Sequence, residues 1–207
     1  MIESFNRHYL FPTKKLRCLS LLMAMYENPA NSQKAIGETA DLSSSMVNNY
    51  MKFFTKEGLI TISGATNRTK RYHLTEAGYE MLTSSLLDYS AEIVRLYSSV
   101  KKEIVHILNG FYAEGIREIL LYGAAETAEI VYSAAREAKL LVTGIVDNDK
   151  NKHQKAFNDF TIRSSDEIGN INFDAIVIAS FGKQEEIYQA IKKITGGKVL
   201  IKRLSDL

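Results

Sequence analysis

Apolar residues in the first third of the chain recur at three- and four-residue steps, which is the spacing of one face of an α-helix. The spacing predicts a helix that begins at Lys14 and ends just before Pro29. Ser32 is an N-cap candidate for a second, shorter helix, and Ser43 is one for a third helix that runs to about Lys56. Three helices joined by tight turns are therefore expected here.

Two short β-prone runs follow, at residues 59–63 and 71–74, and a polar turn over residues 64–69 separates them. The turn and the flanking polar residues predict a β-hairpin. Three helices followed by a hairpin are the element order of a winged helix-turn-helix, an α+β domain that we expect over residues 1–78.

A helical pattern then runs from Thr75 to about Leu108, and we expect a linking helix over residues 79–112. Because this length exceeds that of most globular helices, we also expect a break within it. One stripe steps alternately by four and three residues, as a coiled-coil seam does: Leu86, Ser90, Ile93, Tyr97, Val100, Ile104, Ile107 and Phe111. The stripe favours a homodimer, and the alternative is that it packs against the chain's own C-terminal domain.

After Gly115 the pattern changes to short apolar runs that alternate with amphipathic helices, which is typical of βαβ units and a parallel sheet. We expect strands at residues 118–122, 140–146, 160–162, 175–179 and 198–202, helices at 126–137 and 184–194, and a short helical turn at 165–168. The expected fold of residues 113–207 is an α/β Rossmann-like domain with a short parallel sheet.

The composition narrows the class of protein. Hydrophobic residues make up 45% and charged residues 24% of the chain, which is ordinary for a globular protein, and no apolar stretch approaches the roughly 20 residues of a membrane span. The first eleven residues lack the basic and apolar regions of a secretory signal. We therefore expect a cytoplasmic protein without a membrane partner.

The net charge of +2 is unevenly distributed along the chain. Residues 1–78 carry ten Lys and Arg against six Asp and Glu, whereas the two later segments each carry one more acid than base. A basic excess in the first third is what a surface that contacts DNA phosphates requires.

The third expected helix has the two faces that a DNA-recognition helix needs. Val47, Met51 and Phe54 form an apolar stripe that would hold the helix on its domain. The expected DNA contacts are the short polar side chains of the opposite face and the basic residues of the hairpin: Ser44, Ser45, Asn48, Asn49, Lys52, Arg68, Lys70 and Arg71. Asparagine can form two hydrogen bonds with adenine, and lysine and arginine bind phosphate or guanine.

The runs Asp41-Leu42-Ser43-Ser44-Ser45-Met46-Val47-Asn48-Asn49-Tyr50, Glu57-Gly58-Leu59-Ile60 and Tyr72-His73-Leu74-Thr75-Glu76-Ala77-Gly78 carry a family resemblance. Residues 14–82, which contain them, resemble the MarR-type winged-helix regulators. The resemblance implies a homodimer that binds double-stranded DNA, in which the Leu-Thr-Glu-x-Gly element closes the wing and opens the dimerising helix. A winged helix used only for protein contacts is the alternative.

The turn over residues 123–128 follows an expected strand and opens an expected helix, and Asp147 ends the next strand. This is the layout of a dinucleotide-binding fingerprint, in which the helix N-terminus holds phosphate and the acid holds ribose hydroxyls. Ala125 stands where the middle glycine belongs, and Glu126 adds a negative charge. Because ligands of open α/β sheets lie beyond the strand C-termini, the expected pocket residues are Gly123, Ala124, Ala125, Glu126, Thr127, Asp147, Ser180 and Phe181.

This turn, together with Val146-Asp147-Asn148-Asp149 and Ile178-Ala179-Ser180, resembles the small Rossmann-like, CoA-binding-like domains of polysaccharide-biosynthesis proteins. The resemblance covers residues 118–203. It implies a nucleotide-type ligand, such as a nucleotide sugar or NAD(H), and a regulator of polysaccharide-biosynthesis genes. The alternative is a domain that is purely structural or dimerising.

The four histidines are scattered and no serine has the flanking glycines of a nucleophile elbow, so we expect neither a catalytic nor a metal site. The leading hypothesis is a DNA-binding transcriptional regulator, not an enzyme, whose C-terminal domain senses a nucleotide-type effector. Two alternatives remain. One is a Rossmann-like enzyme or nucleotide-sugar-binding protein with a winged-helix docking module, and the other is a constitutive DNA-binding protein whose C-terminal domain only dimerises.

Overall fold

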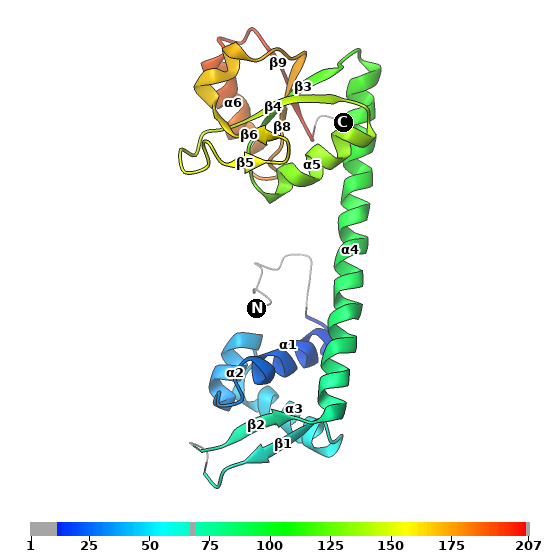
Figure 1. Ribbon diagram of the computed structural model, residues 1–207, viewed down its shortest axis with the longest axis vertical. Helices are drawn as coiled ribbons and strands as arrows, with labels where there is room; N and C mark the ends of the chain where they lie inside the picture. Colours follow the sequence, from blue (N-terminus) through cyan, green and yellow to red (C-terminus); the bar gives the residue numbers. More distant parts are fainter. Residues whose placement is uncertain (1–11, 67–68, 206–207) are drawn as a thin grey trace. The chain divides into compact units, whose positions relative to one another are not determined.

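The computed structural model describes residues 12–66 and 69–205, which form two compact units with a boundary between Val94 and Arg95 (Figure 1). The first unit contains α1 (Lys14–Glu27), α2 (Gln33–Ala40), α3 (Ser44–Lys56), β1 (Ile60–Ser63) and β2 (Arg71–Leu74), and α4 (Glu76–Ala113) continues into the second. The second contains β3 (Glu118–Tyr122), α5 (Glu126–Glu137), β4 (Leu141–Asp147), β5 (Ala156–Phe157), β6 (Phe160–Thr161), β7 (Arg163–Ser164), the 3₁₀ helix η1 (Ser165–Asn170), β8 (Ala175–Ile178), α6 (Gln184–Ile194) and β9 (Leu200–Arg203). The expected fold class is confirmed.

The first three helices begin at hydroxyl caps. The side chains of Thr13, Ser32 and Ser43 each accept a hydrogen bond from the backbone N–H three residues later. Asp41 ends α2 in the left-handed conformation, with φ of 52°, and makes the tight turn into α3. The expected caps at Ser32 and Ser43 are therefore confirmed.

The core of the first unit lies between α1, α3 and the hairpin. Leu21, Leu22 and Met25 of α1 are fully buried, and they belong to the same apolar cluster as the buried stripe of α3 and Tyr72 of β2. Tyr72 also donates its backbone N–H to the carbonyl of Pro29, at 2.9 Å. The hairpin is thus attached to the loop after α1 as well as to the core.

The expected break in the long helix is wrong, because α4 is one continuous helix of 38 residues. It contains no proline, and its two glycines, Gly78 and Gly110, stand near its ends. The hydroxyls of Ser90 and Ser99 donate to carbonyls four residues earlier in the helix, so these polar side chains are accommodated within it. Length alone was a poor reason to expect an interruption.

The two halves of the apolar stripe of α4 differ in burial, which bears on whether it is a dimer seam or packs on the chain's own C-terminal domain. Ile104 and Phe111 are buried in the core of the second unit, with Ile107 packed against it, so the alternative of packing on the chain's own domain is correct for this half. Ile93 and Tyr97, in the other half, are 44% and 42% exposed. Apolar side chains exposed between residues 86 and 100 include Leu86, Leu87, Ile93, Leu96, Tyr97 and Val100.

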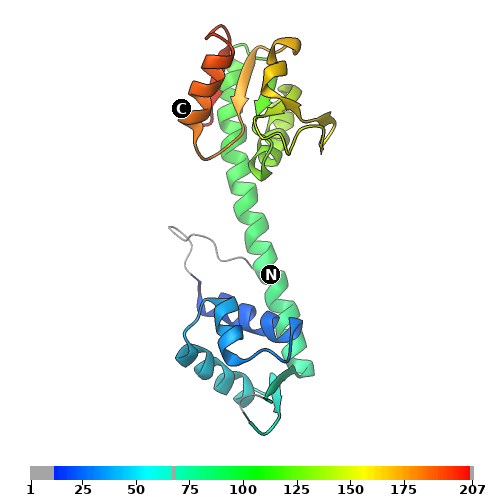
Figure 2. The ribbon, with the colours of Figure 1, turned by 90° about the vertical axis from the view of Figure 1, so that its left-hand side faces the viewer.

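The second unit contains a five-stranded parallel sheet in the order β7-β4-β3-β8-β9. Successive residues of β3 face opposite layers: Ile119 and Leu121 join a core with α5, whereas Leu120 and Tyr122 join a core that contains Ile191 of α6. Figure 2 shows α5 and α6 on opposite sides of the sheet. This is the three-layer arrangement of a Rossmann-like domain.

The strand expected at residues 160–162 exists as β6, but the expectation that it belongs to the parallel sheet is wrong. β6 pairs with β5 in a separate antiparallel hairpin, and β7 is the strand that pairs with β4 at the sheet edge. Phe157 and Phe160 of the hairpin lie edge-on against Tyr132, whose hydroxyl donates to Asp159 at 2.9 Å. The hairpin is thus folded onto α5, a contact that no local pattern indicates.

Candidate functional sites

The exposed face of α3 carries the side chains that the sequence suggests for DNA contact. Val47, Met51 and Phe54 are 0%, 2% and 0% exposed, so the apolar stripe is sealed. The opposite face presents five exposed polar residues, namely Ser44, Ser45, Asn48, Asn49 and Lys52. The helix therefore has one side fixed in the core and one side that is free to enter a groove.

The basic residues of the hairpin are less uniform. Lys70 and Arg71 are half-buried, and Nη1 of Arg71 donates to the carbonyl of Lys70 at 3.0 Å. Arg68 lies outside the described residues. The sequence thus identified basic residues on the hairpin but not the backbone contact of Arg71.

The junction between the hairpin and α4 is closed by Thr75. Its backbone N–H donates to the carbonyl of Leu59 at 3.0 Å, and its Oγ1 donates to the carbonyl of Gly58 at 2.6 Å. The same Oγ1 accepts from the backbone N–H of Gly78 at 3.1 Å, which caps the helix. Two of the sequence runs that carry the family resemblance therefore meet here.

In the second unit, several expected ligand residues meet at the carboxyl ends of β3 and β8. Thr127 Oγ1 donates to the carbonyl of Ala179 at 2.8 Å, and a Cβ on Gly123 would lie 3.9 Å from Ser180. Ser180 Oγ itself donates to the carbonyl of Gly182, and Phe181 is 45% exposed. From β3 the chain first continues to β4 and β7 on one side, and it then crosses to β8 and β9 on the other side. The carboxyl ends of β3 and β8 therefore flank the topological switch point, where sheets of this kind bind ligands.

The N-terminus of α5 faces this place without a side-chain cap. Ala125 is the N-cap residue and makes no side-chain hydrogen bond, so it leaves the helix end to the backbone. Glu126 follows in the first turn and is exposed, and Ala124 is half-buried. The helix dipole favours an anion here, whereas the Glu126 carboxylate opposes one.

Asp147 is buried, at 8% exposure, and its carboxylate is bound within the protein. Oδ1 accepts from the backbone N–H of Asp149 at 2.8 Å, and Oδ2 accepts from the N–H of Ala124 at 2.7 Å and from Nζ of Lys152 at 3.0 Å. Burial by itself would raise the pKa of Asp147, but these hydrogen bonds and the Lys152 charge together lower it. The group is an anion that ties the turn after β3 to the loop after β4.

A polar cluster beside Asp147, which contains two buried hydroxyls, was not singled out from the sequence. Asn148 Oδ1 accepts from the hydroxyls of Tyr122 and Ser165, each at 2.6 Å. Both donors are buried, and burial is the main cause that raises the pKa of Tyr122. Asn148 belongs to a run that the sequence marked, but its partners come from β3 and from η1, so the cluster had no local signal.

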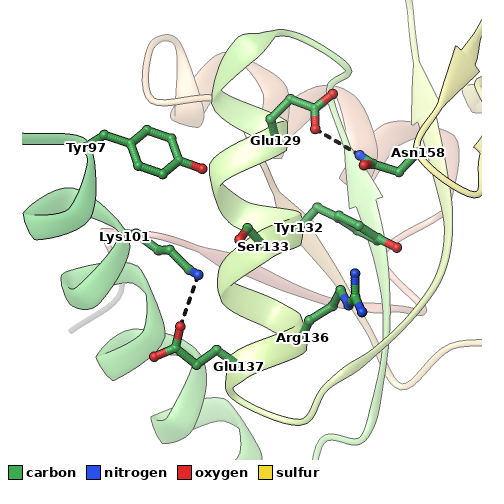
Figure 3. A pocket seen from close by; sticks show the side chains of 8 residues that line it. All are labelled: Tyr97, Lys101, Glu129, Tyr132, Ser133, Arg136, Glu137 and Asn158. Atoms are coloured by element: carbon green, nitrogen blue, oxygen red, sulfur yellow. Dashed lines mark hydrogen bonds and ion pairs between the residues drawn. The ribbon is translucent and has the colours of Figure 1, made fainter. Parts of the chain in front are cut away.

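A hollow of about 500 Å³ lies between α4 and α5 in the C-terminal unit (Figure 3). Its charged groups are partly paired, because Lys101 contacts Glu137 at 3.0 Å and Asn158 donates to Glu129 at 2.8 Å. The lining residues are Tyr97, Lys101, Glu129, Tyr132, Ser133, Arg136, Glu137 and Asn158. The sequence predicted none of them as a DNA or ligand contact, because they come together only where α4 packs against α5.

Within residues 12–66 and 69–205, no group of three or more His, Cys, Asp and Glu is arranged to hold a metal ion. Among the same residues, no helix has both the length and the apolar character needed to traverse a bilayer.

Two family models match the chain. Residues 18–89 match a winged helix-turn-helix model, and residues 115–200 match the C2185-like, N-terminal model. The first match confirms the winged helix-turn-helix that the sequence predicts. No curated protein matches the chain.

Several solved structures are similar at low identity. Staphylococcus aureus MarR in complex with salicylate and kanamycin is 17% identical over 40% of this chain and 56% of its own, with a TM-score of 0.36. A mutant of S. aureus MepR bound to oligodeoxyribonucleotide is 17% identical over 40% and 62%, with a TM-score of 0.34. RSP in complex with β-NADH is 13% identical over 92% and 84%, with a TM-score of 0.34. The chain thus spans less than two thirds of the two S. aureus proteins.

Proposed function

We propose that this chain is a dimeric transcriptional regulator that binds double-stranded DNA in the cytoplasm and responds to a nucleotide-type ligand. The proposal assigns DNA binding to residues 1–78, dimerisation to the linking helix over residues 79–112 and ligand binding to residues 113–207. The observation that carries it is the exposed polar face of α3 above a fully buried apolar stripe.

For the DNA half, the chemistry of α3 supports base contacts in the major groove. Asn48 and Asn49 each offer an amide that can bind adenine with two hydrogen bonds, and Ser44 and Ser45 can donate or accept. Lys52 would bind phosphate or guanine. A winged helix that served only to bind another protein would not need this set of side chains.

Replacing either Asn48 or Asn49 with alanine is expected to weaken binding to the preferred sequence by about 5- to 150-fold, the range for one lost base contact of ~1–3 kcal/mol. Lys52→Ala should instead weaken all duplexes similarly and reduce the salt dependence, if that side chain binds phosphate. Fluorescence anisotropy would measure both effects, on duplexes that the wild-type protein selects from a random pool and on scrambled ones.

Asn109→Ala is the control, because Asn109 is also exposed but lies near the end of α4. It should leave the preference for the selected sequence unchanged. Equal binding of selected and scrambled duplexes by the wild-type protein would show that α3 does not contact base edges in the proposed way.

The exposed stripe of α4 supports the dimer. Its apolar side chains repeat at the spacing of a coiled-coil seam, and a monomer would leave them in water. A second copy is the natural occupant, because two recognition helices in a symmetric dimer would bind two half-sites of DNA.

For the ligand half, the strand order supports a nucleotide. The order β7-β4-β3-β8-β9 corresponds to the third, second, first, fourth and fifth strands of a nucleotide-binding Rossmann sheet. Gly123, with φ of 102°, makes the sharp turn after β3, and the uncapped end of α5 follows. We propose a nucleotide sugar or NAD(H) as ligand and polysaccharide-biosynthesis genes as the regulated target.

Glu126→Gln is expected to raise the affinity for nucleotide ligands about two- to fivefold, because a carboxylate at the helix N-terminus repels phosphate. Isothermal titration calorimetry with NADH and with UDP-glucose would measure the change. Glu103→Gln, which removes the same charge from an exposed site on α4, is the control. Weaker binding in the Glu126 variant would contradict the proposed position of the phosphates.

If neither NADH nor UDP-glucose binds, the sensing half of the proposal is wrong and the chain is better described as a constitutive DNA-binding protein. Calorimetry and DNA binding therefore test the two halves separately.

A further inference from the structure

The acidic residue at the end of β4 does not present its carboxylate to a ligand. In Rossmann domains, such a residue accepts hydrogen bonds from the ribose hydroxyls. Here the Asp147 carboxylate accepts from Ala124, Asp149 and Lys152 and is almost fully buried. Three of the roughly four acceptor sites of this carboxylate are thus occupied within the protein, which leaves little room for a ribose diol.

The next residue, Asn148, is exposed and is held in one orientation by the polar cluster. Its two contacts with Tyr122 and Ser165, at 2.6 Å, have the short length of O–H···O hydrogen bonds, so the amide oxygen is the atom that faces inward. The remaining polar group of the side chain is the amide NH₂, which can only donate. A ribose diol both donates and accepts hydrogen bonds, whereas phosphate oxygens only accept them, so the donors at the carboxyl end of β4 fit a phosphate more completely.

Charges of both signs surround this position, because Asp149 follows Asn148 directly and Asp166 acts on the Tyr122 hydroxyl that binds it. Lys150 and Lys155, in the loop after β4, are exposed. Asp149 Oδ1 accepts from both the backbone and the side-chain amide of Asn151, so this carboxylate is held by its own loop. His153 Nε2 is bound to the backbone carbonyl of Asp147, which fixes the loop close to the strand end.

We infer that Asn148, and not Asp147, contacts the ligand beyond β4, and that it selects a nucleotide with a phosphate on its ribose over one with a free ribose diol. The inference rests on the proposed binding of nucleotides and specifies their class. The phosphate can stand on the 2′ or the 3′ position, because the amide donors and the lysines recognise the same group in both.

The test compares 5′-ADP, 2′,5′-ADP, 3′,5′-ADP and UDP-glucose as ligands of the full chain, by calorimetry at constant ionic strength. One of the two bisphosphates should bind about tenfold more tightly than 5′-ADP, as expected for charge-assisted hydrogen bonds to the added phosphate. The stronger of the two identifies the 2′ or the 3′ position.

Asn148→Asp is the decisive variant, because it keeps an oxygen for Tyr122 and Ser165 and replaces the outward donor with an acceptor. It should abolish the preference or reverse it in favour of 5′-ADP. Asn148→Ala removes the donor without adding charge and should reduce the preference. Asn172→Asp adds the same charge in an exposed position before β8, at the amino end of the strands, and should leave the preference unchanged.

The outcomes separate this inference from the proposed function. If 5′-ADP or UDP-glucose binds and neither bisphosphate binds more tightly, the selection by Asn148 is wrong while nucleotide binding stands. If the bisphosphate preference survives in both Asn148 variants, another residue makes the selection and the inference is also wrong. If none of the four ligands binds, the inference and the proposed sensing of nucleotides both fail.

Discussion

Replacing Ile93 with glutamate is expected to convert a dimer into a monomer. Ile93 is 44% exposed near the middle of α4, and the proposed seam would bury it against a second copy. A charge at this position would lose its water without gaining a partner, which costs several kcal/mol, and the dimer dissociation constant should rise by more than about 100-fold. Sedimentation equilibrium or light scattering would measure the change.

Ala91→Glu is the matched control for this experiment. Ala91 is exposed on α4 two residues earlier, about 200° around the helix, so the same charge is placed on the face away from the seam. This variant should remain a dimer and keep its DNA affinity. A wild-type chain that is monomeric at high micromolar concentration would contradict the proposed seam.

Loss of the dimer should also weaken DNA binding, since a monomer contacts one half-site only. The affinity for a two-half-site duplex should fall to that for a single half-site, while the affinity for the single half-site stays unchanged. Anisotropy with both duplexes distinguishes this effect from damage to α3.

The parts of the fold that local patterns determine were predictable. The amphipathic spacing of α3 fixed which residues are buried, because a helix with one apolar stripe can bury only that stripe. The same reasoning located α5 and α6 and the central strands, whose apolar runs are bounded by polar turns.

Non-local contacts explain what the sequence missed. The hairpin of β5 and β6 depends on Tyr132 of α5, about 25 residues away, and no periodicity of the hairpin itself indicates this partner. The division of the α4 stripe depends on where the second core ends, which only the folded domain defines. Both features depend on tertiary contacts that a local pattern does not show.

The candidate ligand site also depends on contacts between residues that are distant in the sequence. The sequence marked Asp147 correctly as the acid at the strand end, but whether its oxygens are available depends on Ala124, which the parallel pairing of β3 and β4 brings close. Asn148 stood in the marked run without a reason to choose it. Its role depends on Tyr122 and Ser165, which are separated from it by 26 and 17 residues.

Gly78→Ala is expected to destabilise the first unit by about 3 kcal/mol or more, as severe clashes with backbone do. A Cβ at this position would lie 2.0 Å from the carbonyl oxygen of Leu59, and neither atom belongs to a flexible side chain. Relief of the clash would move α4 away from β1 and break the hydrogen bond from Thr75 to that same carbonyl. The last position of the Thr-Glu-x-Gly element must therefore be glycine, because the closed junction leaves no space for a Cβ there.

The helix itself supplies the control, because α4 contains a second glycine. An added Cβ on Gly110 would meet no atom within 4 Å, so Gly110→Ala should stabilise the chain by about 0.5–1 kcal/mol through the helix propensity of alanine. Thermal denaturation followed by circular dichroism should show opposite shifts for the two variants, with a loss of more than about 10 °C for Gly78→Ala. Hydrogen exchange should locate that loss in β1, β2 and the first turn of α4. A Gly78 variant as stable as the wild type would mean that the hairpin and the helix are not held together by this contact.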